Sequence, residues 1–280
     1  MNQGPGSLGF PEPFFLEGKE GRLFCLYQPA LGERRGAVLF VPAFAEEMNR
    51  CRFTVARQTR QLARLGYASL LLDPFGTGDS EGDLPDASWE IWRNDVIRAA
   101  DWLQDRVGIA PTLWGLRLGA LLAADVAQHT PGRFSRMVFW QPVLDGRLYL
   151  TQYLRLRVAS LMDRGLPPET TDGMREALLA GSVLEVAGYR LSGVLTGVMD
   201  GVRMSDFSTL SGLEIDWFEL VSETDKPFTM VSNKLISQLT GQGCTIHSHG
   251  FTGPAIWQLH SRDEVPVLIE MTTDMFRGLA

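Results

Sequence analysis

The residues with the clearest chemical signal lie between Leu113 and Ala120, where the sequence reads Leu-Trp-Gly-Leu-Arg-Leu-Gly-Ala. An apolar run leads into Gly115, and Gly119 follows at the start of a helical pattern. A strand, a tight glycine-bearing turn and a helix form a nucleophile elbow, which lifts its central side chain into a pocket. The centre here is Arg117. A guanidinium stays protonated at neutral pH and forms no acyl-enzyme intermediate, so the elbow lacks its usual nucleophile.

Two adjacent acids, Glu46 and Glu47, follow an earlier apolar run. Carboxylates would repel the negative charge that develops on an oxyanion, but they would offset the desolvation of a partly buried Arg117. Asp79 and Asp225 could supply the same compensation. Helical alternation predicts that only one of the adjacent acids faces inward, and a solvated surface pair is the alternative.

The elements that must position these residues alternate between short apolar runs and helical patterns, which is typical of an α/β protein. We expect an antiparallel hairpin at 14–16 and 23–27, then strands at 37–41, 68–72, 112–114, 137–140, 216–221 and 245–247. Helices are expected at 52–65, 89–103, 118–128, 148–162, 174–179 and 264–276. The pattern predicts a mostly parallel, doubly wound sheet formed by residues 1–144 and 214–280, with a helical cap inserted at 145–213. In such a sheet, ligands bind beyond the carboxyl ends of the strands.

The order of these features resembles the α/β-hydrolase superfamily. The Asp73-to-Ser80 turn, which we interpret as structural, is followed by the elbow, the cap and the acid-bearing loop 222–225. The resemblance implies that Asp225 is the triad acid, with a solvated loop acid as the alternative. It also implies a histidine near the last helix; His260 is the best candidate, although Trp257 lies nearer the expected place.

Two other histidines, His247 and His249, alternate along one strand, and a structural role is expected for each. Backbone amides near Phe44 and at Leu118 would form the oxyanion hole in such a fold. The candidate catalytic residues are therefore Arg117, Glu46, Glu47, Asp225 and His260.

Candidate substrate-binding residues lie around the same rim and share polar or pocket-facing positions: Phe44, Asn49, Leu118, Gln141, Gln152 and Arg155. Gln152 and Arg155 are three residues apart on one helix face. If Arg155 joined Arg117, two guanidiniums would suit a carboxylate, phosphate or sulfate ligand. A solvated face of the cap helix is the alternative for Arg155.

A more specific resemblance rests on Phe-Ala-Glu-Glu-Met-Asn at 44–49, Trp-Gly-Leu-Arg at 114–117, Trp-Gln-Pro at 140–142 and Leu-Thr-Gln-Tyr-Leu-Arg-Leu-Arg at 150–157. These segments look like exosortase A system-associated hydrolase 2. That family is bacterial, and its members are encoded beside export and exopolysaccharide systems. The resemblance implies no established substrate.

Composition limits the classes of partner. The 280 residues carry 26 basic and 33 acidic side chains, a formal charge of −7, so no global basic field attracts nucleic acid. No apolar run approaches the roughly 18 residues that span a bilayer. Residues 1–15 contain no basic residue and no apolar core, so we expect no secretory signal and a cytoplasmic location. The three cysteines form no short-spaced pair, and no metal or cofactor is expected.

Two functions remain open. One is hydrolysis of an ester, thioester or related bond in a small-molecule or lipid-linked acyl or glycan metabolite, in which an activated water attacks and Arg117 stabilises the oxyanion. The other is a non-catalytic protein of the same fold that binds an anionic metabolite or a partner protein. The oligomeric state is also open.

Overall fold

The computed structural model describes residues 9–223, 226–258 and 265–279, so Asp225 and His260 lie outside the described residues. The strands are β1 (Glu12–Glu17), β2 (Arg22–Gln28), β3 (Gly36–Val41), β4 (Tyr67–Leu72), β5 (Thr112–Leu116), β6 (Arg136–Trp140), β7 (Leu184–Val186), β8 (Tyr189–Leu191), β9 (Glu214–Leu220) and β10 (Thr245–Phe251). The helices are α1 (Glu46–Arg64), η1 (Leu84–Asp86), α2 (Trp89–Val107), α3 (Leu118–His129), α4 (Gly146–Asp163), α5 (Thr171–Leu179), α6 (Gly193–Met199), η2 (Met204–Asp206), α7 (Met230–Gly241) and α8 (Pro266–Gly278).

Eight strands form one sheet in the order β1-β2-β4-β3-β5-β6-β9-β10. β1, β2 and β4 pair antiparallel, and every pairing from β4 to β10 is parallel. The predicted opening hairpin and mostly parallel sheet are therefore confirmed. The carboxyl ends of β3 and β5 are adjacent in this order, which brings the segment after each strand to one edge of the sheet.

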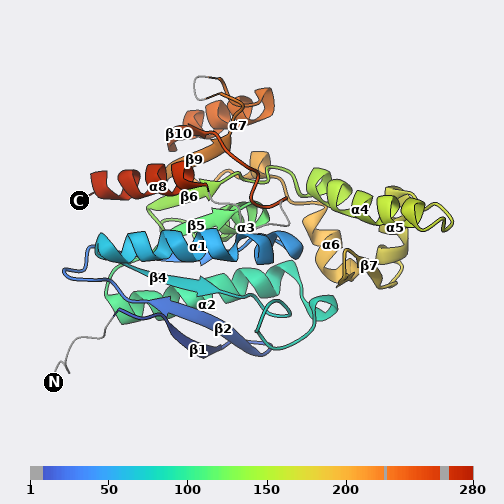
Figure 1. Cartoon of the computed structure of the whole chain (residues 1–280), viewed down its shortest axis with the longest axis horizontal. Helices are drawn as coiled ribbons and strands as arrows, with labels where there is room; N and C mark the ends of the chain where they lie inside the picture. The colour runs from blue at the N-terminus through green and yellow to red at the C-terminus, as the bar shows by residue number, and fades with distance from the viewer. Residues whose placement is uncertain (1–8, 224–225, 259–264, 280) are drawn as a thin grey trace.

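Each face of the sheet has its own apolar core. Along β3, Val38 and Phe40 pack in the cluster that contains residues of α1 and α8, whereas Leu39 and Val41 pack in the cluster that contains residues of α2 and α3. This alternation is what a strand buried on both faces requires. Figure 1 shows α1 and α8 along one side of the sheet and α2 along the other, so the doubly wound arrangement is confirmed.

The chain between β6 and β9 forms a separate group that lies at one end of the sheet, on the right in Figure 1. It contains α4, α5, α6 and the antiparallel pair β7-β8. The short β7-β8 pair was not predicted, because three-residue strands carry too little periodicity to be recognised. We call this group the cap.

Helix α1 begins at Glu46, six residues before the predicted start at residue 52. The residue before it, Ala45, has φ 51° and ψ −124°, a conformation that ends the loop after β3 abruptly. The earlier start places both adjacent acids in the first turn of α1, where the helix dipole favours negative charge.

Within the described part of the chain, no helix is both long and apolar enough to cross a bilayer.

Candidate functional site

Arg117 occupies the centre of a sharp turn between β5 and α3. Its backbone has φ 55° and ψ −119°, a conformation that is strained for any residue with a side chain. A Cβ atom at Gly115 would lie 2.4 Å from the Ala120 Cα, and one at Gly119 would lie 2.3 Å from the Val41 carbonyl oxygen. Both glycines are therefore required by close packing, and the predicted elbow geometry is present.

The guanidinium of Arg117 is held by one carboxylate and two aromatic rings. Its Nε donates to Glu47 Oε1 at 3.3 Å, and its Nη2 lies 3.3 Å from the same oxygen. The guanidinium carbon lies 5.2 Å from the centre of the Trp257 ring and 5.8 Å from that of Tyr149, within the range of cation–π attraction. The side chain of Arg117 is 13% exposed and that of Glu47 is 17% exposed, so the pair is largely removed from water.

Glu47 is shared between the elbow and the cap. The Tyr149 hydroxyl on α4 donates to Glu47 Oε2 at 3.0 Å, while Oε1 faces Arg117. Burial raises the pKa of Glu47, and the opposing effects of Arg117 and the Tyr149 hydroxyl do not cancel it. Burial likewise raises the pKa of Tyr149 well above its ordinary value, so the phenol keeps its proton and donates.

The neighbouring acid, Glu46, also faces the cap. It accepts from Arg50 Nε at 3.3 Å, and the Tyr189 hydroxyl donates to its Oε2 at 3.3 Å. Both acids therefore face the cap, but only Glu47 is largely buried, because the side chain of Glu46 is 39% exposed. Both belong to the first turn of α1, and the cap covers that end of the helix from two sides.

These groups line a cavity of about 460 Å³ that we call the Arg117 cavity. Its lining residues come from α1, the elbow, the cap and the loop after β10: Glu46, Glu47, Arg50, Arg117, Tyr149, Gln152, Tyr153, Leu156, Ala187, Trp257 and Gln258. Two carboxylates and two guanidiniums balance, so the lining carries no net charge.

Gln152 reaches this cavity, but Arg155 does not, and the second guanidinium is that of Arg50. The α4 side chains that line the cavity are Tyr149, Gln152, Tyr153 and Leu156, a stripe with helical spacing, and Arg155 falls outside that stripe and is exposed. Arg155 therefore does not join Arg117 and is not a residue of this cavity; the alternative, a solvated position on the cap helix, is what the structure shows.

Asn49 lies on another face of α1 and lines a second cavity of about 430 Å³, which also contains Arg52 and Tyr189. We call it the Asn49 cavity. The Asn49 amide donates to the Tyr189 hydroxyl at 2.7 Å, so Asn49 does not contact the group around Arg117 directly.

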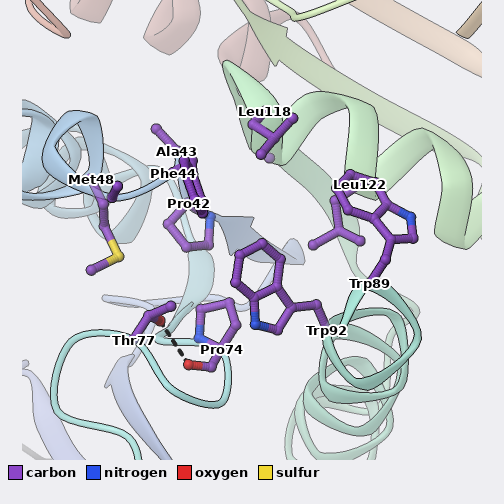
Figure 2. Close-up of a pocket in the computed structure, with 12 residues that line it drawn as sticks. Pro42, Ala43, Phe44, Met48, Pro74, Thr77, Trp89, Trp92, Leu118 and Leu122 are labelled. Atoms are coloured by element: carbon purple, nitrogen blue, oxygen red, sulfur yellow. Dashed lines mark hydrogen bonds between the residues drawn. The ribbon is translucent and has the colours of Figure 1, made fainter. Parts of the chain in front are cut away.

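Phe44 and Leu118 line a third, small cavity of about 20 Å³, enough for about one water molecule. Figure 2 shows the side chains that line this space, with Leu118 at the top of the view, the Trp92 ring at its centre and Met48 at the left. The cavity has mostly apolar walls. Leu118 begins α3, so its backbone N–H has no intrahelical acceptor and is available to an oxyanion.

Gln141 has a structural role rather than the substrate-binding role that we predicted. Its N–H donates to the Phe218 carbonyl at 2.8 Å, and its side-chain Oε1 accepts from the Leu220 N–H at 2.7 Å. The side chain therefore ties the end of β6 to β9, and Gln141 is not among the residues that line the Arg117 cavity.

The histidines that the structure describes take no part in this cavity. His249 Nε2 lies 3.1 Å from Asp216 Oδ1 and its ring stacks on Phe218, so the expected structural role of His249 is confirmed. His247 is exposed on β10. Trp257 lies over Arg117 in the loop where the histidine of a triad was expected. The sequence drew attention to its place but not to that contact, and it carried no signal for Tyr149.

Across the described ranges, no group of three His, Cys, Asp or Glu side chains is arranged to hold a metal ion.

Comparisons with known proteins identify the family. Residues 32–175, which run from before β3 into α5, match the model of a hydrolase family described as serine aminopeptidase S33. The chain belongs to this family. The S33-type chain is accordingly a member of the α/β-hydrolase superfamily, as its sheet and elbow also indicate.

Individual relatives are more distant. A bovine (Bos taurus) protein named mitochondrial palmitoyl-protein thioesterase ABHD10 is 29% identical over 133 residues, which is 47% of this chain and 40% of that protein. The match thus spans well under half of that relative. The mouse ABHD10 structure is 17% identical with a TM-score of 0.58, covering 96% of this chain and 100% of that one.

The structure of Est1E from Butyrivibrio proteoclasticus, solved with ferulic acid bound, is 14% identical with a TM-score of 0.67. The alignment covers 95% of this chain and 97% of that chain. At such identities the structural likenesses establish the fold alone.

Proposed function

We propose that this S33-type chain hydrolyses an ester or thioester by activating a water molecule, with Glu47 as the general base and Arg117 stabilising the oxyanion. The observation that carries the proposal is the contact between Glu47 and Arg117 at the centre of the elbow. Burial raises the pKa of Glu47, which makes it a stronger base than an exposed carboxylate. An arginine in place of the nucleophile removes the covalent route and leaves direct attack by water.

The charge balance of the pair suits this step. Water attacks the acyl carbon and gives its proton to Glu47, while the carbonyl oxygen becomes an oxyanion. Once Glu47 is neutral, Arg117 has no compensating carboxylate, so its charge becomes available at the moment the oxyanion forms. The N–H of Leu118 can add a hydrogen bond. The tetrahedral intermediate then collapses, and the leaving alkoxide or thiolate takes the proton back from Glu47.

Substrate class follows from the lining and from the relatives. The Arg117 cavity has no net charge and contains the rings of Tyr149, Tyr153 and Trp257, which favours an acyl group and a neutral polar portion over a strongly anionic ligand. The name of the bovine relative, a palmitoyl-protein thioesterase, and the ferulic acid in the Est1E structure support acyl chemistry. The resemblance to exosortase A system-associated hydrolase 2 leads us to propose a bacterial, cytoplasmic role on a lipid-linked or glycan-related metabolite.

A panel of p-nitrophenyl esters and acyl thioesters tests the proposal with the purified chain. We expect turnover without a pre-steady-state burst, a loss of about 100-fold or more in kcat for Glu47→Gln and Arg117→Ala, and no labelling by a fluorophosphonate. Glu223→Gln, which changes an exposed acid that pairs with Lys226 outside the cavity, is the control and should keep full activity. Full activity in both cavity variants, or labelling of a serine, would contradict the mechanism.

A second candidate is a non-catalytic binding protein, and one observation favours it. Both oxygens of Glu47 are already engaged, and Trp257 rather than a described histidine contacts the elbow side chain. A ligand that raises the Tm of the chain, with no turnover of any panel substrate, would support binding. Loss of that stabilisation in Arg117→Ala would place the ligand in the Arg117 cavity.

A further inference from the structure

We propose that the Asn49 cavity is a binding site for a neutral saccharide, distinct from the Arg117 cavity. Its volume, about 430 Å³, lies in the range of small-molecule sites. The inference does not depend on hydrolysis, because it concerns binding at other residues.

The two cavities lie on different faces of the same helix. Glu46, Glu47 and Arg50 of α1 face the Arg117 cavity, whereas Met48, Asn49 and Arg52 face the Asn49 cavity. The Tyr189 hydroxyl lies between the two cavities. It accepts from Asn49 Nδ2 at 2.7 Å and donates to Glu46 Oε2 at 3.3 Å. The first turns of α1 and Tyr189 therefore form a shared wall.

The opposite wall is the turn from Asp73 to Ser80, to which the proposed hydrolysis assigns no role. Gly78 has φ +55°, and a Cβ atom there would lie 2.0 Å from Asp73 Oδ2. Because residue 78 has no side chain, the carboxylate of the buried Asp73 fits beside it. That carboxylate accepts from Arg52 Nη2 at 2.8 Å and from the Asp79 N–H at 3.1 Å. The turn is thus fixed with Arg52 and Asp79 beside the cavity.

The charges of this cavity disfavour an anion. Arg52 is already paired with Asp73, and Asp79 is an exposed carboxylate that makes no ion pair with any described residue. Arg52, Asp73 and Asp79 together carry a net charge of −1. A phosphate or carboxylate would meet an uncompensated negative charge, so this cavity disfavours an anionic ligand.

The remaining groups match a polyhydroxyl compound. Donors come from Arg52 and acceptors from Asp79. The Thr77 hydroxyl donates to the Pro74 carbonyl at 2.7 Å and the Tyr189 hydroxyl to Glu46, so each offers a ligand an acceptor only. Met48 contributes apolar surface, as does Leu84. Sugar hydroxyls both donate and accept, and the C–H faces of the ring are apolar, so a saccharide uses both kinds of surface.

Ligand-observed saturation-transfer NMR of the full chain provides the test. The neutral probes are glucose, galactose, mannose and N-acetylglucosamine; glucosamine is the cationic probe and glucuronate the anionic one. We expect saturable binding of at least one neutral probe, stronger than that of glucuronate. Asp79→Ala should weaken it about tenfold, as expected for a lost hydrogen bond to a charged acceptor. The matched control is Asp86→Ala, an exposed acid of η1 that does not line the cavity.

Glu47→Gln separates this inference from the proposed hydrolysis, because it alters the other cavity and should leave saccharide binding unchanged. Failure of every neutral sugar to bind would overturn the proposal. Tighter binding of glucuronate or of glucosamine than of any neutral sugar would overturn it as well, as would binding that Asp79→Ala does not weaken. If the chain binds a neutral sugar but hydrolyses no ester or thioester, the saccharide site is supported and only the proposed hydrolysis is rejected.

Discussion

Ala45 and Arg117 have nearly the same backbone conformation, φ 51° and ψ −124° against φ 55° and ψ −119°. Each residue directly precedes a helix that follows one of two adjacent parallel strands, β3 and β5. The site is therefore built from two neighbouring elbows rather than one. The first starts α1 early enough to bring Glu47 beside the side chain that the second elbow presents.

Strain at Ala45 leads to the first prediction. A residue with a side chain in this region costs about 1–3 kcal/mol, and glycine relieves that cost at the expense of about 0.5–1 kcal/mol of chain entropy and a small buried methyl group. We expect Ala45→Gly to raise the free energy of unfolding by roughly 0.5 kcal/mol and Ala45→Val to lower it by about 2 kcal/mol or more. Urea unfolding measures both.

Ala43→Gly is the control, because Ala43 is buried in the same loop without a positive φ. It should lower stability by about 1 kcal/mol through the lost methyl group and the added chain entropy. A loss of stability in Ala45→Gly as large as that of Ala43→Gly would show that the turn stores no strain.

The second prediction concerns the coupling of Arg117 with Glu47. Removing one partner of a largely buried ion pair leaves an uncompensated charge, so Arg117→Met should lower stability by about 2–4 kcal/mol at pH 7.5. Without Arg117 the pKa of Glu47 rises further, since that guanidinium lowers it in the intact chain. The folded variant then binds a proton more tightly than the unfolded chain, so its stability should recover as the pH falls toward 5.

The double variant Arg117→Met with Glu47→Gln completes the cycle. It removes both charges and should recover most of the stability lost in the single variant, giving a coupling energy of at least about 1 kcal/mol. Additive losses from the two single variants, measured by denaturant unfolding, would mean that the contact contributes no coupling.

Much of the fold followed from local patterns. Buried parallel strands such as β3 and β4 are short, uninterrupted apolar runs, and the elbow is marked by Gly115 and Gly119 at fixed spacing. The early start of α1 was missed because the turn at Ala45 is held by packing at the carboxyl end of β3. It is not marked in the sequence by a turn residue such as glycine.

The site was only partly predictable. Glu47 was one of several acids expected to balance Arg117, and the sequence had no means of choosing among them. The Tyr149 hydroxyl that binds Glu47 lies 102 residues away along the chain, on an inserted helix whose rotation relative to the sheet is not encoded in its periodicity. That same rotation turned Arg155 outward and left Arg50, on the core helix α1, as the second guanidinium of the cavity.

The third prediction tests the close approach of α3 to β3. A Cβ atom on Gly119 would lie 2.3 Å from the carbonyl oxygens of Val41 and Pro42, which are backbone atoms that cannot rotate away. Gly119→Ala should therefore lower stability by about 3 kcal/mol or more, or prevent folding. Gly241→Ala in α7 is the matched control, because nothing lies within 4 Å of its added Cβ, and it should raise stability by about 0.5–1 kcal/mol. Circular dichroism during thermal unfolding distinguishes the two, and equal behaviour would contradict the packing argument.

The fourth prediction uses a buried acid outside both cavities. Burial is the main cause that raises the pKa of Asp95 to about 6 from its ordinary 3.8, although its carboxylate accepts from the Phe75 N–H at 2.9 Å. Between these two values the folded chain holds a proton that the unfolded chain has lost, so this group makes stability fall as the pH rises from about 4 to about 6, after which its effect is constant.

Asp95→Asn keeps the acceptor for Phe75 and removes the charge. At pH 8 the variant should be more stable than the natural chain by roughly 3 kcal/mol, and at pH 4 the two should differ little, because Asp95 is then protonated in the folded chain. Asp105→Asn, on the exposed face of the same helix α2, should change stability by less than about 0.5 kcal/mol at either pH. Urea unfolding at the two pH values measures these differences in the free energy of unfolding. An equal effect of Asp95→Asn at pH 4 and pH 8 would mean that the cost of this carboxylate does not arise from burying its charge.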